Sequence, residues 1–260
     1  MRGIKKLLTA CLVLFILAIG GFLYWLSGQY TVPIMMYHNV DVIDGYRTNT
    51  VSPENFERHM AYLKGHGFHV LSFDELVRLT RDGASVPRKS VVITFDDGYE
   101  DNYVNAYRIL KKYGFPAIIF VPSDLINTEG YLSWEQVKEM VGSGISIGSH
   151  SRRHLYLPDL PVQEQREEIF GSKRIIEQHL GRPSDYFSYP IGGFNDQIKR
   201  FVKEAGYYGA AATNRGYDKK NKDVFELKRI RFGDRDVRND YLWIKLSGYY
   251  NLFRKDKKPY

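Results

Sequence analysis

The chain has 260 residues, of which 43% are hydrophobic and 15% aromatic, and this is enough to bury the core of one complete α/β domain. Its formal net charge is +7, but Lys and Arg are scattered without a nucleic-acid-binding motif, so we expect a mostly solvated basic surface and no nucleic-acid partner. Cys11 is the only cysteine, which excludes a disulfide within the chain and a cysteine zinc site or nucleophile in the domain that follows.

The first segment has the properties of a membrane anchor. Leu7 to Leu26 form a run of twenty residues without a charge, which is about the length of one bilayer span. The basic residues Arg2, Lys5 and Lys6 precede this run, which predicts a cytoplasmic N-terminus and a domain outside the cytoplasm. Secretion after signal cleavage is the alternative, but the end of the run lacks a clear small-x-small cleavage site. We therefore expect a single-pass cell-membrane protein with an anchor at 1–28 and one domain at 29–260.

The domain alternates apolar runs of strand length with amphipathic stretches of helix length. The strand candidates are Pro33 to Tyr37, Phe68 to Leu71, Val91 to Phe95, Ala117 to Val121, Ile145 to Ile147, Tyr186 to Tyr189 and Gly209 to Thr213, with a weaker one near Leu227 to Phe232. The helix candidates are one that begins at Ser52-Pro53 and ends at Gly65 to Gly67, and others at Asp101 to Lys112, Trp134 to Met140, Val162 to Leu180 and Asn195 to Ala205. This alternation predicts parallel β/α units, and therefore a barrel or a doubly wound sheet.

Polar side chains follow several of the predicted strands. In parallel β/α folds the functional sites lie at the carboxyl ends of the strands. The residues at or just past such ends are His38, Asp96, Asp97, His150 and Tyr189. We therefore expect them to converge on one rim of the sheet. Four other histidines lie on or beside helical surface patterns and are assigned no function: His59, His66, His69 and His179.

The pair Asp96-Asp97 indicates a cation site. Two adjacent carboxylates after a buried strand are costly unless a cation, hydrogen bonds or proton sharing compensate them. His150 and His154 lie four residues apart after another strand, and one carboxylate with two neutral imidazoles would leave a position open at a zinc-like ion, as in catalytic sites. In this interpretation Asp97 is the ligand and Asp96 stays free to act on water. A helix cap is the alternative, and it accounts well for only one of the two Asp residues.

Two further segments are ambiguous from the residues alone. His38 is best interpreted as a hydrogen-bonded histidine at the end of the first strand. Tyr189 to Gly193 contain a Pro-Ile-Gly-Gly turn, whose backbone N–H groups either face a reacting oxygen or only complete the turn.

Three motifs carry a resemblance to a known family. Thr94-Phe-Asp-Asp-Gly98, His150-Ser-Arg-Arg-His154 and Phe187-Ser-Tyr-Pro-Ile-Gly192 resemble the first three motifs of the polysaccharide deacetylases, the NodB-homology or carbohydrate esterase family 4 group. Met36-Tyr-His38, followed by Ser52-Pro-Glu-Asn-Phe56, resembles the branch of the poly-N-acetylglucosamine deacetylases, in which the motif order is permuted. The resemblance spans roughly residues 33 to 235.

The resemblance implies a metal-dependent N-deacetylase on a distorted (β/α) barrel of about seven parallel strands. It assigns the general base to Asp96, the general acid to His38, and the metal to Asp97, His150 and His154. Tyr189 and Ile191 are the candidates for oxyanion and substrate contacts. The ion is expected to be Zn²⁺, although Co²⁺, Ni²⁺ or Fe²⁺ also suits these ligands.

The implied substrate is an N-acetylated envelope polysaccharide: peptidoglycan, a β-1,6-linked poly-N-acetylglucosamine or a chitin-like polymer. We expect the protein to act as a monomer. A catalytically silent carbohydrate-binding protein of the same fold and an O-acetyl esterase are the competing interpretations, because substrate choice depends on loops rather than on the fold.

The sequence departs from the family pattern in two places. Ser188 stands where many members carry an Arg that orients the base, so we expect Arg229 or Arg231 to tune Asp96 instead. The usual late Leu-x-His motif is missing, since no histidine follows His179. His38 would then replace that histidine, as in the permuted branch; an impaired enzyme is the alternative.

Overall fold

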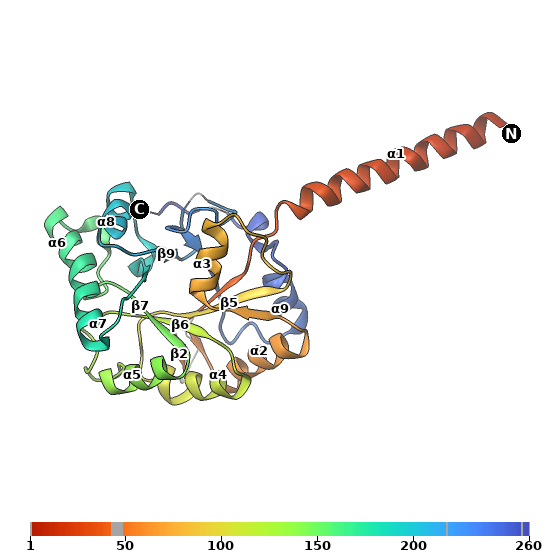
Figure 1. The fold of residues 1–260 in the computed structure, drawn as a ribbon. Helices are drawn as coiled ribbons and strands as arrows, with labels where there is room; N and C mark the ends of the chain where they lie inside the picture. Colours follow the sequence, from red (N-terminus) through yellow and green to blue (C-terminus); the bar gives the residue numbers. More distant parts are fainter. Residues whose placement is uncertain (1, 43–48, 217, 256, 260) are drawn as a thin grey trace.

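The computed structural model describes residues 2–42, 49–216, 218–255 and 257–259, and its main feature is a curled parallel sheet (Figure 1). The sheet has nine strands in the order β10-β9-β8-β7-β6-β5-β1-β11, and β4 pairs with β5 beside this path. The bounds are β1 Ile34–Tyr37, β4 His69–Leu71, β5 Ser90–Phe95, β6 Ala117–Val121, β7 Ile145–Ser149, β8 Tyr186–Ser188, β9 Gly209–Ala212, β10 Leu227–Lys228 and β11 Ile230–Arg231. Every pairing in this sheet is parallel, as the alternation of strands and helices predicts.

One short segment brings the two ends of this sheet together. β10 pairs with β9, whereas β11 pairs with β1, and only Arg229 separates β10 from β11. The Arg229 N–H donates to the Thr213 carbonyl at 3.0 Å, and the Phe232 N–H donates to the Met36 carbonyl at 3.0 Å. The sheet is therefore a nearly closed barrel, which confirms the predicted (β/α) barrel class. The weak strand expected near Leu227 to Phe232 is the segment that nearly closes it.

Helices cover the barrel on its outside (Figure 1). Their bounds are α2 Pro53–Gly65, α3 Phe73–Arg81, α4 Arg108–Tyr113, α5 Trp134–Gly142, α6 Val162–Arg166, α7 Ser172–Leu180, α8 Asp196–Glu204 and α9 Asn239–Leu246. Side chains cap several of them, as at α2, where the Ser52 hydroxyl accepts the Asn55 N–H ahead of Pro53. α3 and α9 are helices that the sequence did not indicate. Wide π-helical turns at Asn102–Tyr107 and Glu167–Gly171 lie within two of the predicted helices.

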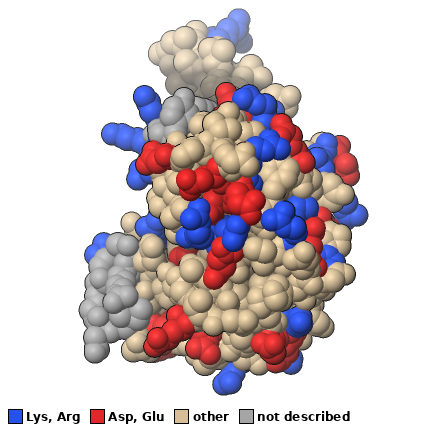
Figure 2. All heavy atoms as spheres, turned by 90° about the vertical axis from the view of Figure 1, so that its left-hand side faces the viewer, with Lys and Arg blue, Asp and Glu red and all other residues tan. Residues whose placement is uncertain are grey.

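The remaining elements are short. β2 Asn39–Val40 and β3 Thr50–Val51 form a two-stranded sheet, and single 3-10 turns occur at Leu157–Asp159, Pro190–Gly192 and Tyr250–Phe253. On the face shown in Figure 2, Lys and Arg lie interspersed with Asp and Glu, consistent with a solvated basic surface.

His59 is buried, whereas we expected it on a helical surface. It is 1% exposed, and its ring bridges the Tyr37 hydroxyl and the Asp236 carbonyl at 2.9 and 2.8 Å.

Alternation along β5 determines which side of the sheet receives the first acidic residue. Val91, Ile93 and Phe95 belong to the apolar cluster that packs against α2 and α4, whereas Val92 belongs to a second cluster. Successive side chains of a strand point to opposite faces, so Thr94 and Asp96 continue the row of Val92. Both are fully buried. The period of the strand thus directs Asp96 away from the helices of the first cluster.

The N-terminal helix α1, Arg2–Ser27, stands apart from this domain (Figure 1). It has 26 residues and none of them is buried. By length and composition it is apolar enough to cross a membrane, and it is the single such helix in the described ranges. The helix therefore contributes nothing to the barrel core.

Candidate active site at the carboxyl ends of the strands

Polar residues from three strands meet at one end of the barrel. Asp96 and Asp97 follow β5, His150 follows β7, and His38 follows β1. The Nε2 atom of His150 lies 3.9 Å from Asp96 Oδ2 and 3.5 Å from Asp97 Oδ1. The predicted convergence of these strand ends is therefore present in the structure.

Asp97, His150 and His154 form a cluster with the dimensions of a metal site. One ligand atom from each of the three residues lies within 4.8 Å of the others, and His154 Nε2 is 3.2 Å from Asp97 Oδ1. The His150 Nδ1 lies 2.8 Å from the Ser188 carbonyl, an acceptor that requires the proton on Nδ1. The lone pair of Nε2 then faces Asp97, which is the tautomer that a metal ligand needs.

Asp97 Oδ1 provides a separate test of whether a cation fits. This oxygen is buried and has no hydrogen-bond partner within the described residues. Burial would raise the pKa of the Asp97 carboxyl, but the rings of His150 and His154, when they carry a proton on Nε2, hold that pKa well below its usual range. A buried, ionised oxygen with an unused lone pair is unfavourable by itself, and a divalent cation bound to it would remove the cost. The donor set and this oxygen therefore fit a metal ion.

The backbone is strained where it presents these groups. Asp97 has φ of 72°, Ser151 of 64°, His154 of 60° and Ile191 of 57°, all in the left-handed region that disfavours side chains. Such conformations persist only where the surrounding structure imposes them, and they cluster at functional sites. Gly98, with φ of 65°, packs so closely that an added Cβ would lie 2.9 Å from Val121 Cγ1.

A buried carboxylate holds the loop that carries the two histidines. Glu168 is 1% exposed, and its Oε2 accepts the backbone N–H groups of Arg152 and Arg153 at 2.9 Å each. Its Oε1 accepts from Arg153 Nε at 2.5 Å, while Arg152 pairs with Asp124 at 2.8 Å. Two of the three residues between the histidines, Arg152 and Arg153, thus anchor the loop to the π-helical turn at Glu167–Gly171. Sequence reasoning missed Glu168, although an acidic residue directly before Ile169-Phe170 was a signal for a buried charge.

Asp96 is bound by an arginine that lies entirely inside the barrel. Arg229 is fully buried, and its Nη1 and Nη2 donate to the two oxygens of Asp96 at 2.7 and 2.6 Å. The other N–H groups donate to Thr94 Oγ1 at 3.2 Å, Ser188 Oγ at 2.9 Å and the Ala212 carbonyl at 2.9 Å. All five donors of the guanidinium are used, and Ser188, at the place of the expected family arginine, contacts both partners.

This ion pair keeps Asp96 ionised. Burial would raise the pKa of the Asp96 carboxyl, but the charge and hydrogen bonds of Arg229, together with His150, outweigh it and hold that pKa below its ordinary value. Asp96 accordingly remains a carboxylate throughout the neutral range. Of the two candidates, Arg231 contributes no hydrogen bond or ion pair to Asp96 within the described chain, and the partner is Arg229. The register explains why: Arg229 follows β10 and points inward, whereas Arg231 is exposed.

His38 follows β1 directly, and its ring lies in the field of Asp96 and Asp97. Its backbone carbonyl accepts from Asn102 Nδ2 at 2.8 Å, and its Nδ1 is buried without a hydrogen-bond partner in the described part of the chain. The Nδ1 atom therefore lacks the hydrogen bond that a satisfied strand-end histidine would have. Burial lowers the pKa of His38, Asp96 and Asp97 oppose this, and the guanidinium groups of Arg229 and Arg231 lower it further.

The two residues expected to contact substrate differ in availability. Tyr189 is fully buried, its hydroxyl donates to the Phe225 carbonyl at 2.9 Å, and its N–H donates to the Ala211 carbonyl at 3.0 Å. Neither donor is free for a substrate, so the assignment of Tyr189 is corrected. Ile191 is 52% exposed, and none of the backbone hydrogen bonds of the described residues uses its N–H.

Comparisons with known proteins identify what the chain is similar to. The profile of the family described as polysaccharide deacetylase matches residues 83–210. The chain is 36% identical over 200 residues to "Putative polysaccharide deacetylase YxkH" of Bacillus subtilis (strain 168), which covers 77% of this chain and 71% of that protein. It is 28% identical over 203 residues to the poly-beta-1,6-N-acetyl-D-glucosamine N-deacetylase of Staphylococcus aureus (strain MSSA476), covering 71% and 68%.

A solved structure agrees with these matches. The Streptococcus pyogenes deacetylase PplD, determined in complex with acetate, is 30% identical to the chain, with a TM-score of 0.72 over 77% of this chain and 92% of that one. Asp96, Asp97, His150 and His154 fall inside the segment matched by the family profile. His38 and Arg229 lie outside it.

Proposed function

Because the chain belongs to the polysaccharide deacetylases, the hydrolases of carbohydrate esterase family 4, we propose that it removes N-acetyl groups from an envelope polysaccharide that contains N-acetylglucosamine. The observation that carries this proposal is the cluster of Asp97, His150 and His154, beside which Arg229 holds the carboxylate of Asp96. The similarity to the poly-beta-1,6-N-acetyl-D-glucosamine N-deacetylase of Staphylococcus aureus supports a poly-N-acetylglucosamine substrate.

Asp97, His150 and His154 would hold a divalent metal ion. Two imidazoles and one carboxylate suit zinc first, and cobalt, nickel or iron by ligand type. When bound, the ion would polarise the acetamide carbonyl and lower the pKa of water, so that hydrolysis proceeds near neutral pH. The remaining steps belong to residues of the chain itself.

Asp96 is the proposed general base. It is ionised, and its Oδ2 lies 3.9 Å from His150 Nε2. Oδ1 accepts from both Arg229 and Ser188, whereas Oδ2 keeps a lone pair beyond its bond from Arg229. It would accept a proton from the attacking water as the new C–O bond forms. Arg229 fixes the carboxylate in one orientation, because both of its Nη groups donate to it.

His38 and Ile191 would complete the reaction. The unused N–H of Ile191 would donate to the carbonyl oxygen as negative charge develops on it. His38, with an unpartnered Nδ1 and in the field of both acidic residues, would in its protonated form give a proton to the leaving nitrogen as the C–N bond breaks. The products are acetate and a glucosamine unit with a free amine, which makes the polymer more positive.

The helix α1 supports a location at the cell membrane with the barrel outside. Basic residues precede its apolar run, and the helix buries nothing against the barrel. Such an anchor would hold the site near an envelope polymer rather than a soluble metabolite. Secretion after cleavage of this helix would place the same domain in the same compartment.

Acetate release from defined polymers tests this proposal. The full chain in detergent is incubated with poly-N-acetylglucosamine, peptidoglycan glycan strands and chitin oligomers, with and without a chelator. We expect release that stops on chelation and returns with added metal. Release from O-acetylated xylan alone would show an esterase instead, and binding of the polymers without any release would show a carbohydrate-binding protein.

A further inference from the structure

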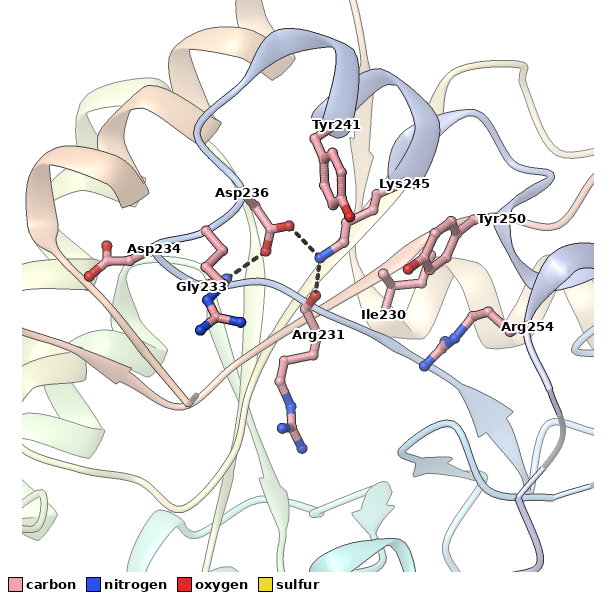
Figure 3. A pocket seen from close by; sticks show the side chains of 10 residues that line it. Ile230, Arg231, Gly233, Asp234, Asp236, Tyr241, Lys245, Tyr250 and Arg254 are labelled. Carbon is pink, nitrogen blue, oxygen red and sulfur yellow. Dashed lines mark hydrogen bonds and ion pairs between the residues drawn. The ribbon is translucent and has the colours of Figure 1, made fainter. Parts of the chain in front are cut away.

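A basic hollow opens beside the proposed oxyanion donor. Its volume is about 370 Å³, and its lining includes Ile191 together with Arg215, Arg231, Arg254 and Lys257. A second hollow of about 460 Å³ shares Arg231 and Arg254 with it (Figure 3). Among the residues that the structure describes, none that lines the first hollow is acidic. This contrasts with the mixed charges on the face in Figure 2.

The acidic residues of the neighbouring hollow are engaged elsewhere. Asp236 pairs with Lys245 at 2.5 Å and accepts the Gly233 N–H, and Figure 3 shows the Arg231 side chain pointing away from it. Asp234 accepts from the Ser52 N–H and from Asn55 Nδ2 at 2.7 and 2.8 Å. Asp236 is therefore compensated by Lys245, and Asp234 is held at the start of α2.

Arg231 and Arg254 themselves lack an acidic partner among the residues that the structure describes. Arg254 is only partly exposed, and its Nη1 donates to the Arg229 carbonyl at 2.9 Å, which fixes the guanidinium at the wall of the hollow. Burial lowers the pKa of Arg254, the nearby Tyr250 opposes this, and the charge of Arg231 lowers it further. Two cations that repel each other at the edge of a cavity would both gain from a bound anion.

The hollow adjoins the reacting groups. Met36 and Ile191 belong to its wall, and Arg231 pairs in register with Met36, two residues before His38. The field of Arg231 reaches the His38 ring. A group bound here would consequently be carried by the same sugar as the acetamide or by a neighbouring one.

We propose that this hollow is an anion subsite, in which Arg231 and Arg254 bind a carboxylate or phosphate substituent of the polysaccharide next to the N-acetyl group that is hydrolysed. The inference rests on the proposed deacetylase function and narrows its substrate to an anionic glycan. Arginine suits this task because its planar fork binds both kinds of oxyanion with paired hydrogen bonds. A neutral polymer would bind without using these charges.

Matched disaccharides separate the charge from the sugar. The neutral substrate is N,N′-diacetylchitobiose, the carboxylate substrate is N-acetylglucosaminyl-N-acetylmuramic acid, and the phosphate substrate is diacetylchitobiose 6-phosphate. Acetate release by the full chain is compared with that of Arg231→Gln, whose side chain is exposed, and of Arg108→Gln, an exposed arginine of α4, as a charge-matched control. Binding of the same disaccharides is measured by calorimetry on the same samples.

We expect Arg231→Gln to lower kcat/KM about tenfold for one or both anionic substrates and less than about twofold for the neutral one, with Arg108→Gln changing neither. The anionic substrate whose kcat/KM falls in Arg231→Gln shows whether the subsite binds a carboxylate or a phosphate. Added salt should weaken the anionic preference of the native chain and have little effect on the variant. An equal effect of Arg231→Gln on charged and neutral substrates, or no effect on either, would overturn the subsite while leaving deacetylation intact.

Failure of the deacetylase proposal would look different. In that case the native chain would release acetate from none of the three disaccharides. Calorimetry would still decide the subsite, because an anionic disaccharide should bind the native chain about tenfold more tightly than Arg231→Gln. Equal binding by the two proteins would refute it.

Discussion

Replacing Arg229 by Met tests how the barrel holds its proposed base. Arg229→Met roughly keeps the volume but removes every hydrogen bond and the charge, leaving the fully buried Asp96 carboxylate without its cation. Breaking a buried ion pair from one side typically costs about 3 to 5 kcal/mol of unfolding free energy. We therefore expect a loss of about 4 kcal/mol at pH 7, most of it the cost of the uncompensated charge. Asp96→Asn/Arg229→Met, which removes both charges, should lose only about half as much.

The pH dependence gives the sign of the effect. In the native chain the pKa of Asp96 is lower in the folded than in the unfolded state. Asp96 therefore adds to the free energy of unfolding at pH values above its unfolded pKa, and this stabilisation is lost as the pH falls through its folded pKa. Without Arg229, burial dominates, and the pKa of Asp96 in the folded state rises above its value in the unfolded state. The variant should therefore lose stability as the pH rises above the unfolded pKa of Asp96. The difference between the two proteins should therefore shrink from pH 7 to pH 4.

Urea unfolding at these two pH values measures that difference. Arg231→Met is the control, since its side chain is exposed and donates nothing to Asp96, and it should change stability by less than about 0.5 kcal/mol. The acid limb of acetate release should also move to higher pH in Arg229→Met but not in the control. A loss below about 1 kcal/mol with an unmoved acid limb would refute the role given to Arg229.

Three further predictions concern the scaffold. Gly98→Ala should cost about 2 kcal/mol in chemical unfolding, because it combines φ of 65° with a Cβ 2.9 Å from Val121, and an unchanged midpoint would contradict this. Glu168→Gln should weaken zinc binding about tenfold by calorimetry, since two N–H groups of the histidine loop lose a charged acceptor; unaltered affinity would exclude this positioning role. Burial lowers the pKa of His59 to about 4, so the unfolded chain takes up the proton first and stability should fall by about 3 kcal/mol between pH 6.5 and pH 4. His59→Gln should flatten that fall, and an unaltered slope would assign it to other groups.

The sequence predicted the parts of the site that lie on regular strands. The apolar run before Asp96 and the run before His150 identified β5 and β7, and parallel packing then brings their ends together. The pattern also predicted parallel β/α units, in a barrel or a doubly wound sheet, because the strands alternate with helices throughout, and the family resemblance then favoured the barrel. These features depend on local periodicity and on one general property of parallel sheets.

The parts that the sequence left open depend on tertiary contacts. Arg229 and Arg231 are two residues apart in a weak strand, and only the change of partner between β10 and β11 decides which one enters the barrel. Tyr189 follows a strand like the other site residues, yet its hydroxyl bonds to Phe225, whose position sequence reasoning does not fix. His59 has a surface pattern but is covered by the loop at Asp236.

Metal content measured beside activity tests the division of labour between the two acidic residues most directly. Full-length native chain, Asp96→Asn and Asp97→Asn are purified identically, and bound zinc and acetate release from poly-N-acetylglucosamine are determined on the same samples. We expect Asp97→Asn to lose most of the metal and the activity, whereas Asp96→Asn should keep the metal and lose at least about a hundredfold in kcat. Loss of metal in Asp96→Asn, or full activity in either variant, would contradict it.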